Sequence, residues 1–154
     1  MIELKRILLP TDFSESSQTA VRYAKAFAET FHASLHVLHV VEDPFLYYPA
    51  SEISVPPLDY RRQMEQSARE QLNQIMTDAR RAGIDAQLAL RVGSPFVEII
   101  RYAKTESIDL ILMGSLGLGP IGHMLMGSVA ENVVRKAPCP VLTVRHPEHE
   151  FVLP

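Results

Sequence analysis

The chain has 154 residues, of which 47% are hydrophobic and 21% charged, and its formal net charge is −3. A chain of this length forms one domain that buries roughly two thirds of its unfolded surface. This charge balance gives no reason to expect DNA or RNA as a partner, and no apolar run approaches the roughly 18–20 residues of a membrane helix. We therefore expect a globular domain with neither nucleic-acid binding nor membrane insertion.

The first ten residues lack the basic region and the long apolar stretch of a secretory signal. The single cysteine, Cys139, permits no intrachain disulfide and favours a packing role. Both features lead us to expect a cytoplasmic protein. His36 and His39 lie three apart on a predicted strand and therefore point to opposite faces, so we expect no metal ion between them.

The first part of the chain predicts a strand, a helix and a second strand. Residues 4–9 are a short, mostly apolar run that Pro10 closes, which is typical of a buried strand. Thr11, Asp12 and Ser14 are candidate N-caps for the helix that follows. Residues 34–41 form the second apolar run. The helix between them has apolar residues at spacings of three and four: Ala20, Ala24, Phe27, Ala28 and Phe31.

A proline-rich segment separates this unit from the rest. Residues 43–57 contain four prolines and no hydrophobic periodicity, so we expect a mobile loop that acts as a flap beside the ligand. A long helix is predicted from about Leu58, with Gly83 as its C-terminal glycine. The remaining elements are strands at 85–92, 109–113 and 140–145, a helix after Ser94-Pro95, and a helix over 128–136.

Strands and helices thus alternate strictly, which predicts an α/β fold with one doubly wound sheet. We expect five parallel strands in the order 3-2-1-4-5, with helices on both faces. Residues 1–146 are expected to form this single domain and residues 147–154 a flexible C-terminal tail. Ligands of such sheets bind beyond the carboxyl ends of the strands, where the strand order reverses. That rule directs attention to residues 10–14 and 114–128.

Five of the seven glycines lie between Gly114 and Gly127, and several motifs overlap there. Residues 117–122 spell the dinucleotide fingerprint GxGxxG, but they do not follow the first strand and no acidic residue lies about 20 residues further on. Residues 122–128 resemble a P-loop without its lysine, which makes ordinary P-loop chemistry an unsuitable interpretation. The third pattern is Gly114-x2-Gly117-x9-Gly127-Ser128.

This third pattern follows a strand ending in Met-Gly and precedes the segments SVAENVV and PCPVLTVR. Together with the opening ILLPTDFSESSQTAVRYA, it resembles the universal stress protein family over residues 3–145. The resemblance implies ATP as the ligand, in those members that bind it. It implies that the first loop places its aspartate near the nucleotide, that the end of strand two lines the adenine, and that the glycine loop holds ribose and phosphates. The matching positions are Pro10, Thr11 and Asp12; Val40 or Val41; and Met113, Gly114, Gly117, Gly127, Ser128 and Val129.

Elementary chemistry agrees with this assignment. Glycines let backbone N–H groups approach phosphate oxygens, and a helix starting at Ser128 offers unpaired N–H groups and a partial positive charge. The Asp12 carboxylate can accept hydrogen bonds from ribose hydroxyls or lie near Mg²⁺. Leu116 and Leu118 stand where family members often carry cationic or histidine side chains, and His123 is the loop's ionisable residue. With so little side-chain charge, we expect only micromolar affinity for ATP.

The leading hypothesis is an ATP-binding regulatory stress-response protein whose nucleotide occupancy alters its conformation or its binding to a protein partner. A nucleotide-free interaction module of the same fold is the alternative that Leu116 and Leu118 favour. A slow ATPase is left open, although the sequence shows no catalytic set of residues. We also expect a homodimer, because the apolar strand 140–145 would lie at an edge of the sheet.

Overall fold

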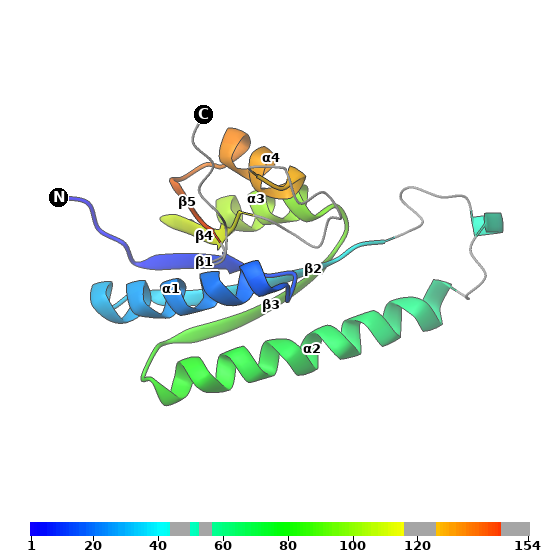
Figure 1. Cartoon of the computed structure of the whole chain (residues 1–154), viewed down its shortest axis with the longest axis horizontal. Helices are drawn as coiled ribbons and strands as arrows, with labels where there is room; N and C mark the ends of the chain where they lie inside the picture. Colours follow the sequence, from blue (N-terminus) through cyan, green and yellow to red (C-terminus); the bar gives the residue numbers. More distant parts are fainter. Residues whose placement is uncertain (44–49, 53–56, 116–125, 146–154) are drawn as a thin grey trace.

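The computed structural model describes residues 1–43, 50–52, 57–115 and 126–145. Within these residues strands and helices alternate along the chain (Figure 1). The strands are β1 (Arg6–Pro10), β2 (Ser34–Val41), β3 (Ala86–Val92), β4 (Leu110–Gly114) and β5 (Val141–Val144). The helices are α1 (Glu15–Phe31), α2 (Pro57–Arg81), α3 (Pro95–Thr105) and α4 (Ser128–Lys136), and a short 3₁₀ turn, η2, spans Ala50–Glu52.

The five strands form one parallel sheet in the order β3-β2-β1-β4-β5, which confirms the predicted architecture. Helices α1 and α2 cover one face and α3 and α4 the other (Figure 1). The strand order reverses between β1 and β4, so the expected ligand edge lies at the carboxyl ends of these two strands. Strands β3 and β5 are the two edges.

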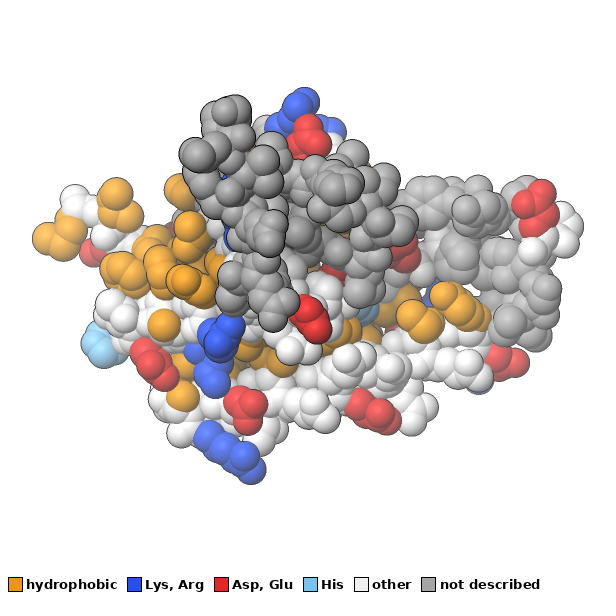
Figure 2. All heavy atoms as spheres, in the orientation of Figure 1, with side chains coloured by type: hydrophobic (Ala, Val, Ile, Leu, Met, Phe, Trp, Pro, Cys, Tyr) orange, Lys and Arg blue, Asp and Glu red, His pale blue; other side chains and the backbone are white. Residues whose placement is uncertain are grey.

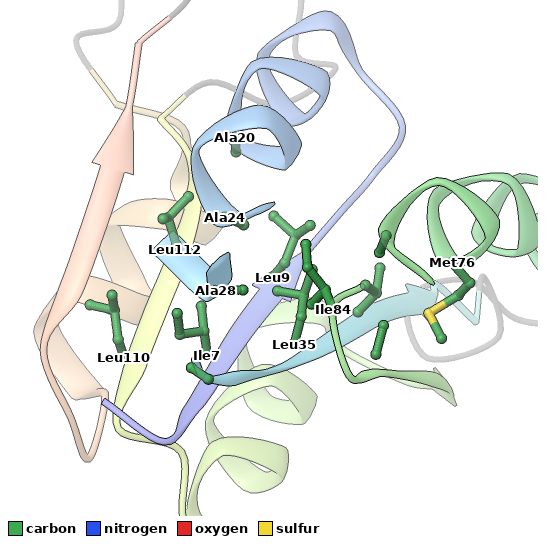
Figure 3. Close-up of a cluster of buried hydrophobic side chains, with 14 of the residues drawn as sticks. Ile7, Leu9, Ala20, Ala24, Ala28, Leu35, Met76, Ile84, Leu110 and Leu112 are labelled. Carbon is green, nitrogen blue, oxygen red and sulfur yellow. The ribbon is translucent and has the colours of Figure 1, made fainter. Parts of the chain in front are cut away.

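Alternating residues of each strand divide between two hydrophobic clusters, one on each face of the sheet. On the α1 and α2 face, Ile7, Leu9 and Leu35 pack beneath three alanines of α1 spaced four residues apart (Figure 3). Small side chains at these positions let the helix approach the sheet closely. On the other face, Leu8 and Met113 pack against α3 and α4.

Local signals fix where several helices begin and end. Ser14 is the N-cap of α1, and its hydroxyl accepts a hydrogen bond from the Ser17 amide at 3.2 Å. Ser94 is the N-cap of α3, followed by Pro95 at the first helical position, as predicted. Gly83 has φ +79°, and its N–H donates to the Arg80 carbonyl at 3.0 Å, so it ends α2 as expected.

The first strand differs from its predicted span of 4–9, since it begins at Arg6 and includes Pro10. Its start is displaced because the amides of Lys5 and Arg6 donate to the Asp109 carboxylate at 2.8 and 2.9 Å rather than to a neighbouring strand. Pro10 remains in the strand because it still pairs in register with Leu38 of β2.

Candidate functional site

The candidate site lies at the switch point of the sheet, which is the place between β1 and β4 where the strand order reverses. It begins where the pairing of these two strands stops. These strands pair at Ile7 with Leu110 and at Leu8 with Ile111. The Thr11 amide donates to the Leu38 carbonyl of β2, so odd-numbered residues of β1 turn their backbone groups toward β2 and even-numbered ones toward β4. Pro10 therefore lacks the N–H that would face β4. The proline helps end this ladder and lets the two strands part at the predicted ligand edge.

The first loop is held by a compact hydrogen-bond network around Asp12. One oxygen of its carboxylate, Oδ1, accepts from the Ser17 hydroxyl at 2.6 Å and from the Ser14 amide at 3.0 Å. Thr11 contributes through its hydroxyl oxygen, which accepts from the Phe13 amide at 3.1 Å. Of the predicted N-caps, Ser14 takes that role and Asp12 does not. The carboxylate is instead fixed just ahead of the helix, partly exposed at the carboxyl end of β1.

His39 of β2 supports this loop from beneath. Its Nδ1 lies 2.8 Å from the Thr11 carbonyl oxygen, and its ring stacks against Phe13 with 4.6 Å between centroids. Because a carbonyl only accepts, Nδ1 carries the hydrogen in this contact. Burial lowers the pKa of His39, while the Thr11 carbonyl and the nearby Asp12 oppose that shift. The neutral imidazole of His39 therefore holds the loop in place through its contacts with Thr11 and Phe13.

The end of β2 carries Val40 and Val41, both buried. Val40 belongs to the cluster on the α3 and α4 face, and Val41 points to the opposite side because successive strand residues alternate. The Val41 carbonyl accepts from the Gly93 amide at 3.0 Å. The predicted pair thus presents one side chain to each face, and Val40 is the one on the face of α4.

Gly114 ends β4 and has a packing role that the sequence did not indicate. A Cβ at this position would lie 2.6 Å from the Ser16 hydroxyl oxygen and 2.9 Å from the Ser16 carbonyl carbon. Gly114 therefore lets the N-terminal turn of α1 pass over β4. Met113, beside it, is buried on the opposite face in the cluster that includes Ala130 and Val133 of α4.

Helix α4 begins directly above this strand end. Gly127 is its N-cap, with φ −70° and ψ 154°, and as a glycine it has no side chain that could cap the first turn. The Gly127 amide donates to the Ser115 carbonyl at 2.7 Å, which ties the helix start to β4. Ser128 is exposed and Val129 is half-buried. The N-cap residue thus leaves the first N–H groups of α4 without a capping side chain of its own, and such groups are suited to an anion.

The structure therefore gathers most of the predicted site residues at one edge of the sheet. Pro10, Thr11 and Asp12 follow β1, the two valines end β2, Met113 and Gly114 end β4, and Gly127 to Val129 open α4. Gly117, together with Leu116, Leu118 and His123, lies outside the described residues. Most of the proline-rich loop 43–57 and the tail 147–154 lie outside them as well.

Sequence reasoning missed Ser115, a residue that is only 2% exposed. Within the described part of the chain, its hydroxyl has no hydrogen-bond partner, and no other buried side-chain nitrogen or oxygen there shares that property. The available signal was its position, since a polar residue directly after a buried strand stands at the ligand edge of a parallel sheet.

Other chemistries find little support among the described residues. No group of three or more His, Cys, Asp and Glu side chains in the described ranges is arranged to hold a metal ion. Burial raises the pKa of the Cys139 thiol, which disfavours its reactive thiolate form. No described helix combines the length and the hydrophobicity needed to cross a membrane.

A doubly wound parallel sheet in the order 3-2-1-4-5, with a helix N-terminus at the carboxyl end of its fourth strand, defines the α/β class with the Rossmann-type strand order. The sequence matches the universal stress protein family over residues 3–145, and the chain belongs to that family. This result confirms the resemblance drawn from the glycine loop and the first strand.

Two archaeal relatives illustrate how far the similarity extends. The universal stress protein MJ0531 of Methanocaldococcus jannaschii is 34% identical over 149 residues, which cover 95% of this chain and 85% of the relative. The universal stress protein MJ0577 of the same organism is 31% identical over 153 residues, covering 92% and 94% of the two chains. The solved structure of MJ0577 superposes with a TM-score of 0.85 at 30% identity and covers 96% of this chain and all of that one.

A further solved structure is described as a universal stress protein in complex with cAMP. It is 27% identical, has a TM-score of 0.65, and covers 95% of this chain and 98% of its own.

Proposed function

We propose that this protein binds an adenine nucleotide, ATP in the first place, and acts as a regulatory protein in a stress response. In this proposal nucleotide occupancy in the cytoplasm alters the protein's conformation or its binding to a protein partner. The observation that carries it is the start of α4, where Gly127 leaves the first N–H groups without a side-chain cap directly above the end of β4. Such a helix start stabilises a phosphate group through its N–H groups and its partial positive charge.

The neighbouring residues suit the rest of a nucleotide. Asp12 has its carboxylate fixed through Oδ1, which suits hydrogen bonds with ribose hydroxyls. The exposed Ser128 hydroxyl is a second donor for phosphate oxygens. Mg²⁺ would reduce the charge of a triphosphate, and Asp12 supplies the acidic side chain among the predicted site residues. The solved relative described in complex with cAMP supports an adenine nucleotide as the ligand class.

The charge distribution supports a small ligand rather than a large polyanion. Acidic and basic side chains are interspersed over the face of the molecule seen in Figure 2. The formal net charge is −3, so the protein as a whole does not attract nucleic acid. Backbone dipoles at the start of α4 would act on the phosphates locally.

Two measurements test nucleotide binding in the parent protein. Native mass spectrometry of the purified protein detects any nucleotide that co-purifies with it. Calorimetric titration then measures the affinity of the nucleotide-free protein for ATP with Mg²⁺, for which we expect a Kd in the micromolar range because backbone groups supply most of the contacts. Absence of saturable binding of ATP and of AMP at millimolar concentration would contradict the proposal.

A substitution at the N-cap separates folding from binding. Gly127→Asp is compatible with the backbone, because φ is −70° and aspartate is a favoured N-cap residue. We expect the variant to unfold at the same temperature as the parent or slightly higher, since a capping carboxylate stabilises the helix start. The same carboxylate would repel phosphate and occupy the N–H groups, which should weaken ATP binding by several kcal/mol at about 1.5–3 kcal/mol for each charge-assisted hydrogen bond.

Gly127→Asn is the matched control, because asparagine caps the helix equally well without a negative charge. We expect it to keep more of the affinity for ATP than Gly127→Asp. If both variants fold and bind ATP as tightly as the parent does, the start of α4 is not the phosphate site.

A nucleotide-free interaction module is the second candidate, and the edge strand β5 favours it. The carbonyls of Pro140 and Val144 accept from the amides of Ile111 in β4 and of Ser115 directly after it, so Thr143 turns its backbone groups toward the unpaired edge. Val141 and Leu142 are only half-buried. Such an edge is suited to pairing with another strand, and we propose a homodimer through residues 140–145 in either candidate function.

A further inference from the structure

Ser115 links the end of β4 to β5 and to the start of α4 through its backbone. Its amide donates to the Val144 carbonyl of β5 at 2.9 Å, and its carbonyl accepts from the Gly127 amide at 2.7 Å. The residue therefore lies directly between the end of β4 and the start of α4. Both backbone groups are used in these contacts, so the hydroxyl is the group that remains available to a ligand.

The direction of the Ser115 side chain follows from the ladder between β4 and β5. The amides of Ile111 and Ser115 donate to the Pro140 and Val144 carbonyls, so the two-residue periodicity of the strand continues through Ser115. Ile111 and Met113 place their side chains in the cluster on the α3 and α4 face. Gly114 faces the opposite way, toward Ser16 of α1. The Ser115 side chain is therefore on the α4 side of the sheet, near the helix start at Gly127.

The hydroxyl at this position is unusual in energetic terms. It is buried, with the residue 2% exposed, and it is the one buried side-chain polar atom of the described residues without a hydrogen-bond partner. A buried hydroxyl without a partner destabilises the folded state, because it loses its hydrogen bonds to water and gains none. By contrast, the buried hydroxyls of Ser17 and Thr19 donate to the Asp12 carboxylate and to the Glu15 carbonyl.

We propose that Ser115 is a ligand-binding residue whose hydroxyl donates a hydrogen bond to a phosphate oxygen of the nucleotide at the start of α4. This inference rests on the proposed function and adds to it a residue that the glycine pattern does not include. A phosphate oxygen only accepts hydrogen bonds, and a serine hydroxyl is free to rotate and donate. The bound phosphate would thus satisfy both the first N–H groups of α4 and the unpaired hydroxyl beside them.

The proposal predicts opposite effects of Ser115→Ala on folding and on binding. Without ligand, the variant should unfold at the temperature of the parent or higher, because alanine removes an unpaired buried polar group. Its affinity for ATP and for AMP should fall roughly 10- to 100-fold, the range that corresponds to one hydrogen bond to a charged group. Its affinity for adenosine, which has no phosphate, should match that of the parent.

Thr19→Val is the matched control. Thr19 is also buried, at 5% exposure, but its hydroxyl donates to the Glu15 carbonyl at 3.3 Å within α1. This variant should unfold at a slightly lower temperature and bind ATP like the parent. The experiment consists of thermal unfolding without ligand and calorimetric titration of the three proteins with ATP, AMP and adenosine.

Three results would overturn the inference. The first is Ser115→Ala binding ATP as tightly as the parent, and the second is an equal loss of affinity for adenosine, which would place the contact on the nucleoside. The third is unfolding of ligand-free Ser115→Ala at a clearly lower temperature, which would show that the hydroxyl is bonded within the protein. A parent protein that binds neither ATP nor AMP would instead contradict the proposed function itself, and that result precedes any comparison with the variant.

Discussion

Gly114→Ala tests whether the first glycine of the loop is needed for packing as well as for ligand binding. The added Cβ would lie 2.6 Å from the Ser16 hydroxyl oxygen, 2.9 Å from the Ser16 carbonyl carbon and 3.0 Å from the Ser16 carbonyl oxygen. The hydroxyl can rotate away from such a contact, but the two backbone atoms cannot move unless the start of α1 moves with them. Relief therefore requires α1 and β4 to separate at the edge where the site lies.

The size of the effect follows from this geometry. Inserting a methyl group into a closely packed contact costs about 1–3 kcal/mol, and a backbone obstacle favours the upper part of that range. For a chain of this size we expect the unfolding temperature to fall by about 2–4 °C per kcal/mol. Ser16→Ala, combined with Gly114→Ala, should restore only part of the stability, because it removes the hydroxyl contact and leaves both backbone contacts.

The assay is urea unfolding of the parent, both single variants and the double variant in the absence of nucleotide. We expect Ser16→Ala to recover part of the unfolding free energy that Gly114→Ala loses. The coupling free energy between the two positions should therefore be favourable but smaller than the whole loss caused by Gly114→Ala. If Gly114→Ala unfolds at the parent's urea concentration without ligand, the packing argument is wrong. The role of Gly114 would then lie entirely in the approach of the ligand.

Three further predictions concern the helix start, the edge strand and the buried histidines. Ser128→Ala should weaken ATP binding by about 1–2 kcal/mol in calorimetry, since it removes one donor, and an unchanged Kd would argue against a phosphate contact there. Thr143→Pro removes an N–H on the unpaired side of β5 and should convert a dimer into a folded monomer in sedimentation at tens of micromolar; a monomeric parent at that concentration would refute the dimer. Burial lowers the pKa of His36 and His39 from the ordinary 6.5, so the unfolded chain takes up protons first on acidification. The free energy of unfolding should therefore keep the full contribution of these neutral histidines above pH 6.5 and decrease below it, by up to about 1.4 kcal/mol per pH unit for each histidine. Equal urea midpoints at pH 7.5 and 5.5 would contradict this.

Sequence patterns predicted the architecture because each element carries its own local signal. Short apolar runs marked the strands, Ser94-Pro95 marked the start of α3, and Gly83 marked the end of α2. Strict alternation of strands and helices then restricted the fold to a doubly wound parallel sheet. The family resemblance located the loops at the switch point, and the structure brings their described residues to one edge.

The details that sequence patterns missed depend on contacts between distant residues. The start of β1 is set by Asp109, about a hundred positions away, which accepts the amides of Lys5 and Arg6. The packing role of Gly114 depends on Ser16 of another element. Ser115 has a position after a buried strand that marks the ligand edge, but its unpaired hydroxyl is visible only once burial and hydrogen bonding are compared.

An amide NMR titration of the ¹⁵N-labelled protein with ATP and Mg²⁺ tests the central claim most directly. The account predicts saturable shifts at the first loop and at the start of α4, with the largest at Asp12, Ser115, Gly127 and Ser128. Residues of the edge strand β3 and the middle of α2 should remain unaffected, because they lie away from the switch point. Shifts confined to the α2 side of the sheet, or no shifts at millimolar ATP, would contradict the nucleotide site proposed at the junction of β1, β4 and α4.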